Sequence, residues 1–337
     1  MSILCTCFSM KMFDLYHANT FGIHAKALNY HEIKTIEAVR ELPAYPAENI
    51  YILGGGSNVI LNDVIQTPVY RMRIMGIDRL PDDGQYYYFE VGAGVGWHDF
   101  VSLTMEQACF GLENLALIPG TVGAAPVQNI GAYGSELARF VYKVKAWNRK
   151  TQQFYELSAQ DCRFSYRHSL FKEEPWWCIT SVVFKLPKQD EPNLSYPVLK
   201  EAVGLSAHPK AIFEAVCRIR REKLPDPQKV GNVGSFFKNC TIQPKTYQAL
   251  LETYQHVPVF IQEDGSYRLP TAWLIEQAGW KGFSNGRVGV HDKQALVLIN
   301  KGGACFSDVK KLAEMIQHSV AEKFGLTIEV EPSFWYE

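Results

Sequence analysis

The stretch Leu117-Ile-Pro-Gly-Thr-Val-Gly-Ala-Ala-Pro-Val-Gln-Asn-Ile-Gly-Ala-Tyr-Gly134 bears most directly on the fold. It carries no charged residue and is rich in glycine, alanine and proline, so it is too irregular for a helix and too long for a turn. Small residues let a backbone lie close to a large flat ligand, and Thr121, Gln128 and Asn129 could supply hydrogen bonds. A solvated linker would be more polar. The stretch therefore predicts a buried loop that wraps a ligand.

A second glycine-rich turn, Gly54-Gly-Gly-Ser-Asn58, directly follows the apolar run Ile50-Tyr-Ile-Leu53. Glycines let the backbone approach a phosphate, and the side chains of Ser57 and Asn58 can donate hydrogen bonds to it. Three glycines alone fit an ordinary loop equally well. No Gly-Lys-Ser/Thr follows, which excludes a P-loop. The turn Gly92-Ala-Gly-Val-Gly-Trp97 lacks the third glycine of the Rossmann dinucleotide fingerprint, which excludes that site as well.

Around these turns, apolar runs alternate with turn residues, as expected of an α+β or α/β domain that ends near residue 190. Strands are predicted over residues 50–53, 86–91, 141–147, 153–157 and 178–186. Helices are predicted over residues 30–42 and 98–110, and, beyond a polar linker at residues 188–193, over 210–223 and 307–324. In the last helix Val309, Leu312, Met315 and Ile316 form the expected apolar stripe. Residues 326–330 are expected to form a closing strand.

The composition excludes several classes of protein. With 337 residues, two or three domains are expected. Lys+Arg number 34 against Asp+Glu 35, so no strong field favours nucleic acid or an anionic membrane. The eight cysteines form no C-x-x-C pair, which favours reduced thiols in a cytosol. No apolar stretch approaches the ~20 residues of a membrane span. The nine histidines show no metal-ligand spacing, so no metal is expected.

Three basic or polar segments are candidate sites, each with an ordinary structural alternative. Arg163-Phe-Ser-Tyr-Arg-His-Ser-Leu-Phe-Lys172 is a solvated basic face, or an anion site in which Arg167 offers a planar fork and Tyr166 a hydroxyl. Arg220, Arg221 and Lys223 complement the dipole of a helix end, or bind a diphosphate. Ser235, in Gly231-Asn-Val-Gly-Ser-Phe-Phe-Lys-Asn239, is a competent proton donor only if its conjugate base is stabilised nearby.

Read together with Asn19-Thr-Phe21 and Glu331-Pro332, these segments resemble the UDP-N-acetylenolpyruvoylglucosamine reductase family. They occur in the family's order from about residue 19 to the C-terminus. The resemblance implies an α+β protein. Residues 1–12 have no counterpart in the family and are expected to form a poorly ordered N-terminal extension. An FAD-binding fold of the vanillyl-alcohol oxidase type follows over residues 13–190, in two subdomains that divide near residue 70. A C-terminal α+β substrate-binding domain covers residues 191–337, and its final strand returns to the active site.

The resemblance also implies the chemistry: reduction of UDP-N-acetylglucosamine enolpyruvate to UDP-N-acetylmuramate by NADPH through non-covalent FAD. Arg167, Ser235 and Glu331 are the implied catalytic residues. The diphosphate would be held by Arg220, Lys223 and Asn239, and Tyr196 resembles the tyrosine whose loop closes over substrate in the first type of the family. The implied FAD contacts are Leu53, Gly54, Gly55, Gly56, Ser57, Asn58, Gly120, Thr121, Gly123, Ala124, Gln128, Asn129, Gly131 and Tyr166. A cytoplasmic monomer that binds neither membrane nor nucleic acid is expected.

Two other functions fit parts of the sequence. One is an FAD-dependent oxidase or dehydrogenase of the same fold with a different substrate. The other is a sugar-nucleotide-binding or flavin-storage protein without turnover. Against the second stands the joint presence of Arg167, Ser235 and Glu331, which simple binding does not need.

Overall fold

The computed structural model describes residues 12–189, 192–204, 207–262 and 264–336, so the predicted extension lies outside the described residues except for Met12. The largest sheet has five antiparallel strands in the order β13-β12-β14-β9-β8. In that order the strands are Gln153–Ser158, Val141–Asn148, Trp177–Pro187, Tyr86–Gly92 and Ile77–Leu80. The four strands predicted in this part of the chain are therefore confirmed.

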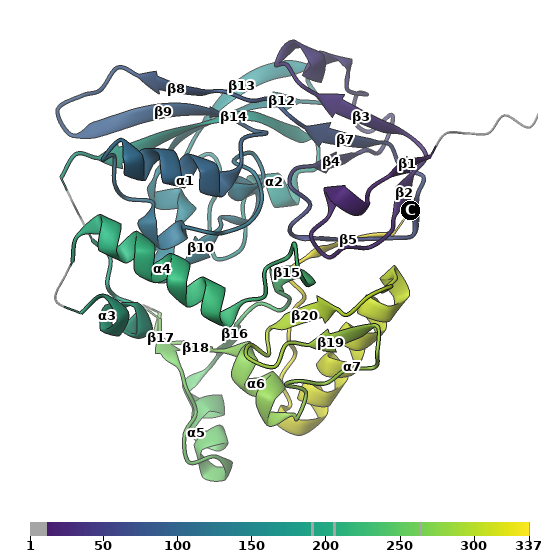
Figure 1. Cartoon of the computed structure of the whole chain (residues 1–337), viewed down its shortest axis with the longest axis vertical. Helices are drawn as coiled ribbons and strands as arrows, with labels where there is room; N and C mark the ends of the chain where they lie inside the picture. The colour runs from purple at the N-terminus through teal and green to yellow at the C-terminus, as the bar shows by residue number, and fades with distance from the viewer. Residues whose placement is uncertain (1–11, 190–191, 205–206, 263, 337) are drawn as a thin grey trace, which may run out of the picture.

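Helix α1 (Trp97–Glu106) lies along this sheet (Figure 1). The ring centroid of Phe100 is 4.8 Å from that of Phe184 on β14 and 6.0 Å from that of Phe89 on β9. All three rings are buried, so α1 covers the apolar face of the sheet. The helix is shorter than the predicted span of 98–110 because the backbone of Ala108 turns left-handed, with a φ of 55°.

A parallel three-stranded sheet precedes the large sheet in the sequence. Its central strand β7 (Val69–Met72) pairs with β3 (Tyr30–Ile33) on one side and with β4 (Tyr51–Leu53) on the other. The helix predicted over residues 30–42 is wrong, since it is replaced by β3 and a short 3-10 turn at Glu37–Glu41. Hydrogen bonds to a strand almost forty residues away outweigh the local helical spacing, which no local pattern reveals.

The remaining strands are short, and the remaining helices range from about one turn to about five. The small sheets are β1 (Phe13–Asp14) with β2 (Lys26–Ala27) and β6 (Val64–Ile65), β10 (Gly131–Ala132) with β11 (Ser135–Glu136), β15 (Gly231–Ser235) with β20 (Val297–Asn300) and β19 (Val288–Val290), and β16 (Cys240–Ile242) with β18 (Tyr267–Leu269) and β17 (Phe260–Ile261). The other helices are α2 (Leu170–Glu173), α3 (Pro197–Val203), α4 (Pro209–Lys223), α5 (Pro244–Thr253), α6 (Thr271–Gln277) and α7 (Phe306–Phe324).

The two long amphipathic helices of the second half, α4 and α7, confirm the predicted spans to within one residue. Val309, Leu312 and Ile316 of α7 are buried, as the stripe predicts. Met315 is 42% exposed, so its place in the stripe is wrong. Consecutive residues on a helix are about 100° apart, so Met315 and Ile316 point in different directions and only one of them faces the core.

The chain returns to its own first half through β21 (Ser333–Trp335), which pairs in parallel with β5 (Val59–Leu61). Figure 1 shows the C-terminus beside β5. The strand predicted over residues 326–330 is therefore wrong: of these residues only Val330 bridges, to Phe237. The strand lies at residues 333–335 instead, because these are the residues that pair with β5.

Two buried clusters cross the predicted domain boundary. The first joins the large sheet and α1 to apolar residues of α4, among them Ile212 and Val216. The second joins N-terminal residues such as Leu53 and Ile60 to the core around α7. Helices α3 and α4 therefore pack with the part of the chain that precedes residue 190. The division at residue 190 and the subdomain division near residue 70 stay predictions.

Trp335 should contribute strongly to stability, because it is 6% exposed and stacks on Tyr51 with 4.1 Å between ring centroids. We expect Trp335→Ala to lower the free energy of unfolding by about 3–5 kcal/mol in urea denaturation. Ile261→Ala is the control, since Ile261 is 75% exposed and its truncation should change stability by about 0.5 kcal/mol or less. Equal losses in the two variants would contradict this role of β21.

Candidate active site

The two glycine-rich loops predicted to bind a ligand lie directly against each other. A Cβ atom on Gly55 would be 2.9 Å from the Cα of Gly120, a distance that no side chain tolerates. The hydroxyl of Ser57 donates a hydrogen bond to the carbonyl of Pro119, with 3.1 Å between oxygens. Glycine at position 55 is thus required by backbone contact between the loops.

Thr121 supplies an unsatisfied polar group at this contact. Its Oγ1 is buried and has no hydrogen-bond partner among the described residues. A Cβ on Gly54 would lie 2.7 Å from this oxygen, so the hydroxyl faces the bare backbone of the first loop. Buried hydroxyls nearly always have a partner, so the residues here fit a bound ligand with an acceptor at this point.

Asn129, predicted to contact the ligand, uses its whole amide within the protein. Its Oδ1 accepts from the backbone N–H of Ala138 at 2.9 Å, and its Nδ2 donates to Glu136 Oε2 at 2.9 Å and to the carbonyl of Ser165 at 3.2 Å. The side chain ties the long loop to the segment that carries Arg167. Ligand binding by Asn129 stays a prediction, and the observed contacts point to a role in shaping the loop.

The structure brings Arg167 and Glu331 together from distant parts of the chain. Nε of Arg167 lies 2.9 Å from Oε1 of Glu331, and their side chains are 18% and 8% exposed. The N–H bond is not aligned for a hydrogen bond to that oxygen, while the terminal nitrogen donates to the carbonyl of Gly131 at 3.1 Å. Burial raises the pKa of Glu331 above its ordinary value, outweighing the lowering effect of Arg167 and of nearby Lys172.

Ser235 lies at the end of β15, next to the backbone of Glu331. The carbonyl of Phe236 accepts a hydrogen bond from the N–H of Glu331 at 2.9 Å, so the two segments run side by side. Gly234 before it has a φ of 71°, the left-handed conformation that glycine adopts without strain. Within the described ranges the Ser235 hydroxyl has no protein partner, which leaves it available to a ligand.

Thr20 connects β15 to the first glycine-rich loop. Its N–H donates to the carbonyl of Gly56 at 3.0 Å, and its hydroxyl donates to the carbonyl of Asn232 at 2.7 Å. The N–H of Asn232 donates in turn to the carbonyl of Thr20 at 3.0 Å. Thr20 therefore holds the strand that carries Ser235 beside the predicted cofactor loop.

Of the predicted substrate contacts, Tyr196 and Arg220 lie near each other. Tyr196 meets Tyr133 edge to face, with 5.4 Å between ring centroids. The Nε of Arg220 is buried without a partner in the described structure. Burial lowers the pKa of Arg220, and the nearby Tyr133 opposes that shift. A buried cation without a carboxylate partner suits an anionic ligand. Lys223 is exposed at the end of α4.

Asn239, the other predicted substrate contact, joins a second group. Its N–H donates to the hydroxyl of Tyr166 at 3.3 Å, and its Oδ1 accepts from the N–H of Thr271 at 3.1 Å. The guanidinium carbon of Arg268 lies 4.0 Å from the centre of the Tyr166 ring. Its Nε is buried without a partner among the described residues. Sequence reasoning missed Arg268, because it belongs to a short strand with no motif and reaches the site only through tertiary packing.

Lys172 also lies beside this site, in the basic segment, but sequence reasoning gave it no role. Burial and the nearby charge of Lys238 lower the pKa of Lys172. Lys238 itself forms an ion pair with Glu329 at 2.7 Å. Arg167, Lys172 and Lys238 thus surround the two acidic residues at positions 329 and 331 with positive charge.

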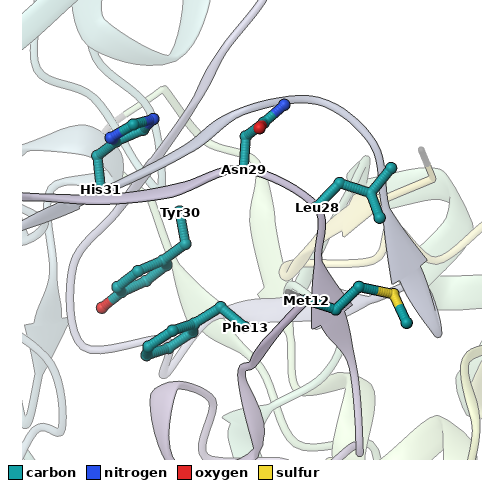
Figure 2. Close-up of a pocket in the computed structure, with 6 residues that line it drawn as sticks. All are labelled: Met12, Phe13, Leu28, Asn29, Tyr30 and His31. Atoms are coloured by element: carbon teal, nitrogen blue, oxygen red, sulfur yellow. The ribbon is translucent and has the colours of Figure 1, made fainter. Parts of the chain in front are cut away.

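A surface hollow elsewhere on the molecule holds none of the predicted site residues (Figure 2). Figure 2 shows the rings of Phe13 and Tyr30 side by side in it, and their centroids are 3.8 Å apart. The other lining residues are Met12, Leu28, Asn29 and His31. The hollow is open, and none of its lining residues is Asp, Glu, Lys or Arg.

Two further observations concern the part of the chain that the structure describes. None of its helices combines the length and the apolar character needed to cross a membrane. It holds no group of three or more potential metal ligands among histidine, cysteine, aspartate and glutamate.

Comparison with known proteins identifies relatives over nearly the whole chain. A family model described as UDP-N-acetylenolpyruvoylglucosamine reductase, C-terminal domain, matches residues 226–335, and an FAD binding domain model matches residues 30–152. UDP-N-acetylenolpyruvoylglucosamine reductase of Bordetella pertussis is 45% identical over 95% of this chain and 93% of its own length. Its counterpart in Dechloromonas aromatica is 42% identical over 95% of this chain and 98% of its own length.

The crystal structure of the UDP-N-acetylenolpyruvylglucosamine reductase from Thermus caldophilus resembles this chain with a TM-score of 0.67. The match covers 96% of this chain and 98% of that one, at 22% sequence identity. At this identity the match concerns the fold alone. The predicted α+β fold, with an FAD-binding domain followed by a C-terminal domain, is confirmed.

Contact between the glycine loops makes a testable prediction about cofactor retention. In Gly55→Ala the new Cβ must push the loop of Gly120 away, so we expect FAD to bind at least about fivefold more weakly. The measurement is titration of the flavin-free protein with FAD, followed by flavin absorbance. Gly84→Ala is the control, because a Cβ there meets no atom within 4 Å. Equal FAD affinity in Gly55→Ala and the original chain would contradict the prediction.

Proposed function

The chain belongs to the UDP-N-acetylenolpyruvoylglucosamine reductase family, and from that premise we propose that Arg167, Glu331 and Ser235 carry its chemistry. The protein is an FAD-dependent oxidoreductase of peptidoglycan precursor synthesis. It uses NADPH to reduce the enolpyruvyl group of UDP-N-acetylglucosamine enolpyruvate, which gives UDP-N-acetylmuramate. The observation that carries the assignment of residues is the buried Arg167–Glu331 pair beside Ser235.

The chemical difficulty of the reaction explains why such a pair is useful. An enol ether that carries a carboxylate is a poor hydride acceptor, because addition of hydride places further negative charge on the neighbouring carbon and the carboxylate. Donors and positive charge that are already in place where this charge develops lower the barrier. Arg167 supplies a fixed positive charge, and Glu331 supplies a donor when it is protonated.

The raised pKa of Glu331 supports this division of roles. A carboxyl group that is 8% exposed keeps a proton to higher pH than one in water. An anionic substrate beside it would raise the pKa further, since two negative charges disfavour each other. Glu331 can therefore donate a hydrogen bond to the substrate carboxylate, as a neutral acid.

Ser235 is proposed to protonate the carbon next to the carboxylate. Its hydroxyl has no protein partner in the described structure and follows a glycine that lets the backbone turn toward the site. A positioned proton donor contributes typically about 10²–10⁴-fold to the rate. Stabilisation of the serine alkoxide, or relay of its proton, falls to the cationic surroundings that Arg167 and Lys172 provide.

The cofactor is proposed to lie between the two glycine-rich loops. FAD supplies the hydride transfer when it is bound there. Thr121 fits such a ligand, because its buried hydroxyl lacks a partner in the described structure and faces the loop of Gly54. The remaining FAD contacts are proposed for Leu53, Gly55, Gly56, Ser57, Asn58, Gly120, Gly123, Ala124, Gln128, Asn129, Gly131 and Tyr166.

The sugar-nucleotide diphosphate is proposed to bind near Arg220, Lys223 and Asn239, with Tyr196 closing over it. The buried, unpartnered Nε of Arg220 supports an anion at that end of the site. The chain is further proposed to act as a cytoplasmic monomer without membrane or nucleic-acid partners. Support comes from the six described cysteines, which are free thiols as expected in a reducing compartment, and from the net charge of −1.

Substitution of Ser235 should separate the two half-reactions, reduction of FAD by NADPH and reoxidation of FAD by the substrate. Ser235→Ala should be reduced by NADPH at a near-normal rate, because Ser235 acts only after hydride has been passed on. Its reoxidation by the enolpyruvyl substrate should be at least ~10²-fold slower than in the original chain. Stopped-flow flavin absorbance measures both rates. Normal reoxidation by the substrate would sink the Ser235 assignment.

The second prediction concerns pH. Because the protonated form of Glu331 is the proposed donor and its pKa is raised, the reoxidation rate should fall as pH rises through that pKa. Glu331→Gln keeps a neutral hydrogen-bond donor but cannot titrate, so this basic limb should disappear from the pH profile. The rate of substrate-driven reoxidation across the pH range is the measurement. If the pH profile of Glu331→Gln keeps the same basic limb, another group causes that limb and the prediction is contradicted.

A further inference from the structure

Two side-chain amides connect the first glycine-rich loop to the carboxyl group of Glu331. Nδ2 of Asn58 donates to Oε1 of Gln128 at 2.6 Å, and Nε2 of Gln128 donates to Oε1 of Glu331 at 3.3 Å. Nδ2 of Asn58 also lies 3.5 Å from the backbone carbonyl oxygen of Glu331. Both ends of the Gln128 amide are thus engaged by protein groups.

The backbone of Glu331 determines which way these amides point. A backbone carbonyl only accepts hydrogen bonds, so Asn58 must turn its NH2 group toward it. The same NH2 group faces Gln128, which must therefore present its carbonyl oxygen to Asn58. The NH2 group of Gln128 is then left facing the Glu331 carboxyl. A second hydrogen bond, from the N–H of Ser333 to the carbonyl of Asn58 at 3.0 Å, holds the loop beside this segment.

This arrangement makes the two carboxyl oxygens of Glu331 different. Oε1 accepts a hydrogen bond from Gln128 Nε2 at 3.3 Å and lies 2.9 Å from Arg167 Nε, whose N–H is not aligned with it. Neither nitrogen can accept a hydrogen bond. A proton on Oε1 would point at another donor. The proton of the neutral acid therefore belongs on Oε2.

We propose that Gln128 is a positioning residue for Glu331: its amide, oriented by Asn58, keeps Oε1 unprotonated and assigns to Oε2 the proton that Glu331 donates in a hydrogen bond. The inference rests on the proposed function for its consequence in catalysis, since it deepens the role given to Glu331. This role of Gln128 is additional to the cofactor contact proposed for it.

The cationic groups around Glu331 lower its pKa. Arg167 and Lys172 each favour the charged form of Glu331, as does Lys238, which also forms an ion pair with Glu329 at 2.7 Å. Gln128 adds a neutral donor to the same oxygen. Loss of this hydrogen bond should destabilise the carboxylate form of Glu331 relative to the neutral acid. The pKa of Glu331 should therefore rise.

The test is a pH titration of the Glu331 carboxyl in the FAD-loaded protein by infrared spectroscopy. The band of the protonated carboxyl is assigned through its loss in Glu331→Gln. In Gln128→Met, which keeps the volume but removes the donor, we expect the titration midpoint to rise by about one pH unit. The basic limb of substrate-driven flavin reoxidation should move to higher pH by the same amount.

Asn58→Ala provides a second, independent variant. It frees the Gln128 amide to rotate, so the midpoint should rise again, by less than in Gln128→Met. The double variant should shift the midpoint no further than Gln128→Met alone, because Asn58 acts through Gln128. If Gln128→Met does not retain FAD, Asn58→Ala decides: a raised midpoint supports the proposal and an unchanged one overturns it.

Gln317→Met is the matched control. Gln317 donates to the carbonyl of Ile328 at 2.8 Å, so this substitution removes an amide hydrogen bond from the same C-terminal segment without touching the Glu331 carboxyl. Its midpoint should equal that of the original chain. An unchanged midpoint in Gln128→Met, or an equal shift in Gln317→Met, overturns the proposal. Absence of substrate-driven reoxidation in the original chain would refute the proposed function instead, and the infrared titration would still decide on Gln128.

Discussion

The buried contact between Arg167 and Glu331 is the interaction that the rest of the structure must hold in place. A guanidinium and a carboxyl group whose side chains are only 18% and 8% exposed are costly to remove from water unless their geometry is held firmly. Two backbone arrangements hold it. β21 pairs with β5 and carries the C-terminal segment back to the glycine loop, and the N–H of Glu331 bonds to the segment of Ser235. The site exists only where these distant segments meet.

The Arg167–Glu331 pair provides a preorganised environment for negative charge that develops on a substrate. Burial favours a proton on Glu331, while Arg167 keeps a fixed positive charge beside it. Ser235 is left without a protein partner among the described residues, so its hydroxyl is free to face a ligand. Preorganised groups of this kind need no rearrangement when charge develops on a substrate, which is where their benefit over water arises. The same polar groups shape the cofactor loops, because Asn58 and Gln128 belong to both.

Sequence reasoning succeeded where the pattern is local. Helix α4 and four of the five strands of the large sheet follow from apolar spacing, and the glycine loops follow from residues that a close backbone contact requires. It failed where partners are distant. Residues 30–33 form a strand because β7 is available to pair with them, and Arg268 reaches Tyr166 only through tertiary packing. The amide of Asn129 bonds to Glu136, Ala138 and Ser165, contacts that the sequence did not reveal, and its predicted contact with a ligand stays a prediction.

The pairing of β21 with β5 also has a consequence for the order of events during synthesis. Its two strands lie at residues 59–61 and 333–335, so the first must wait for almost the entire chain before its partner leaves the ribosome. The buried cluster around them likewise combines residues before 70 with residues after 232. A nascent chain that stops before residue 331 has neither Glu331 nor β21, the strand that follows it. A nascent chain of this kind can form the large sheet early, but it cannot assemble the proposed site until residues 331–335 have left the ribosome.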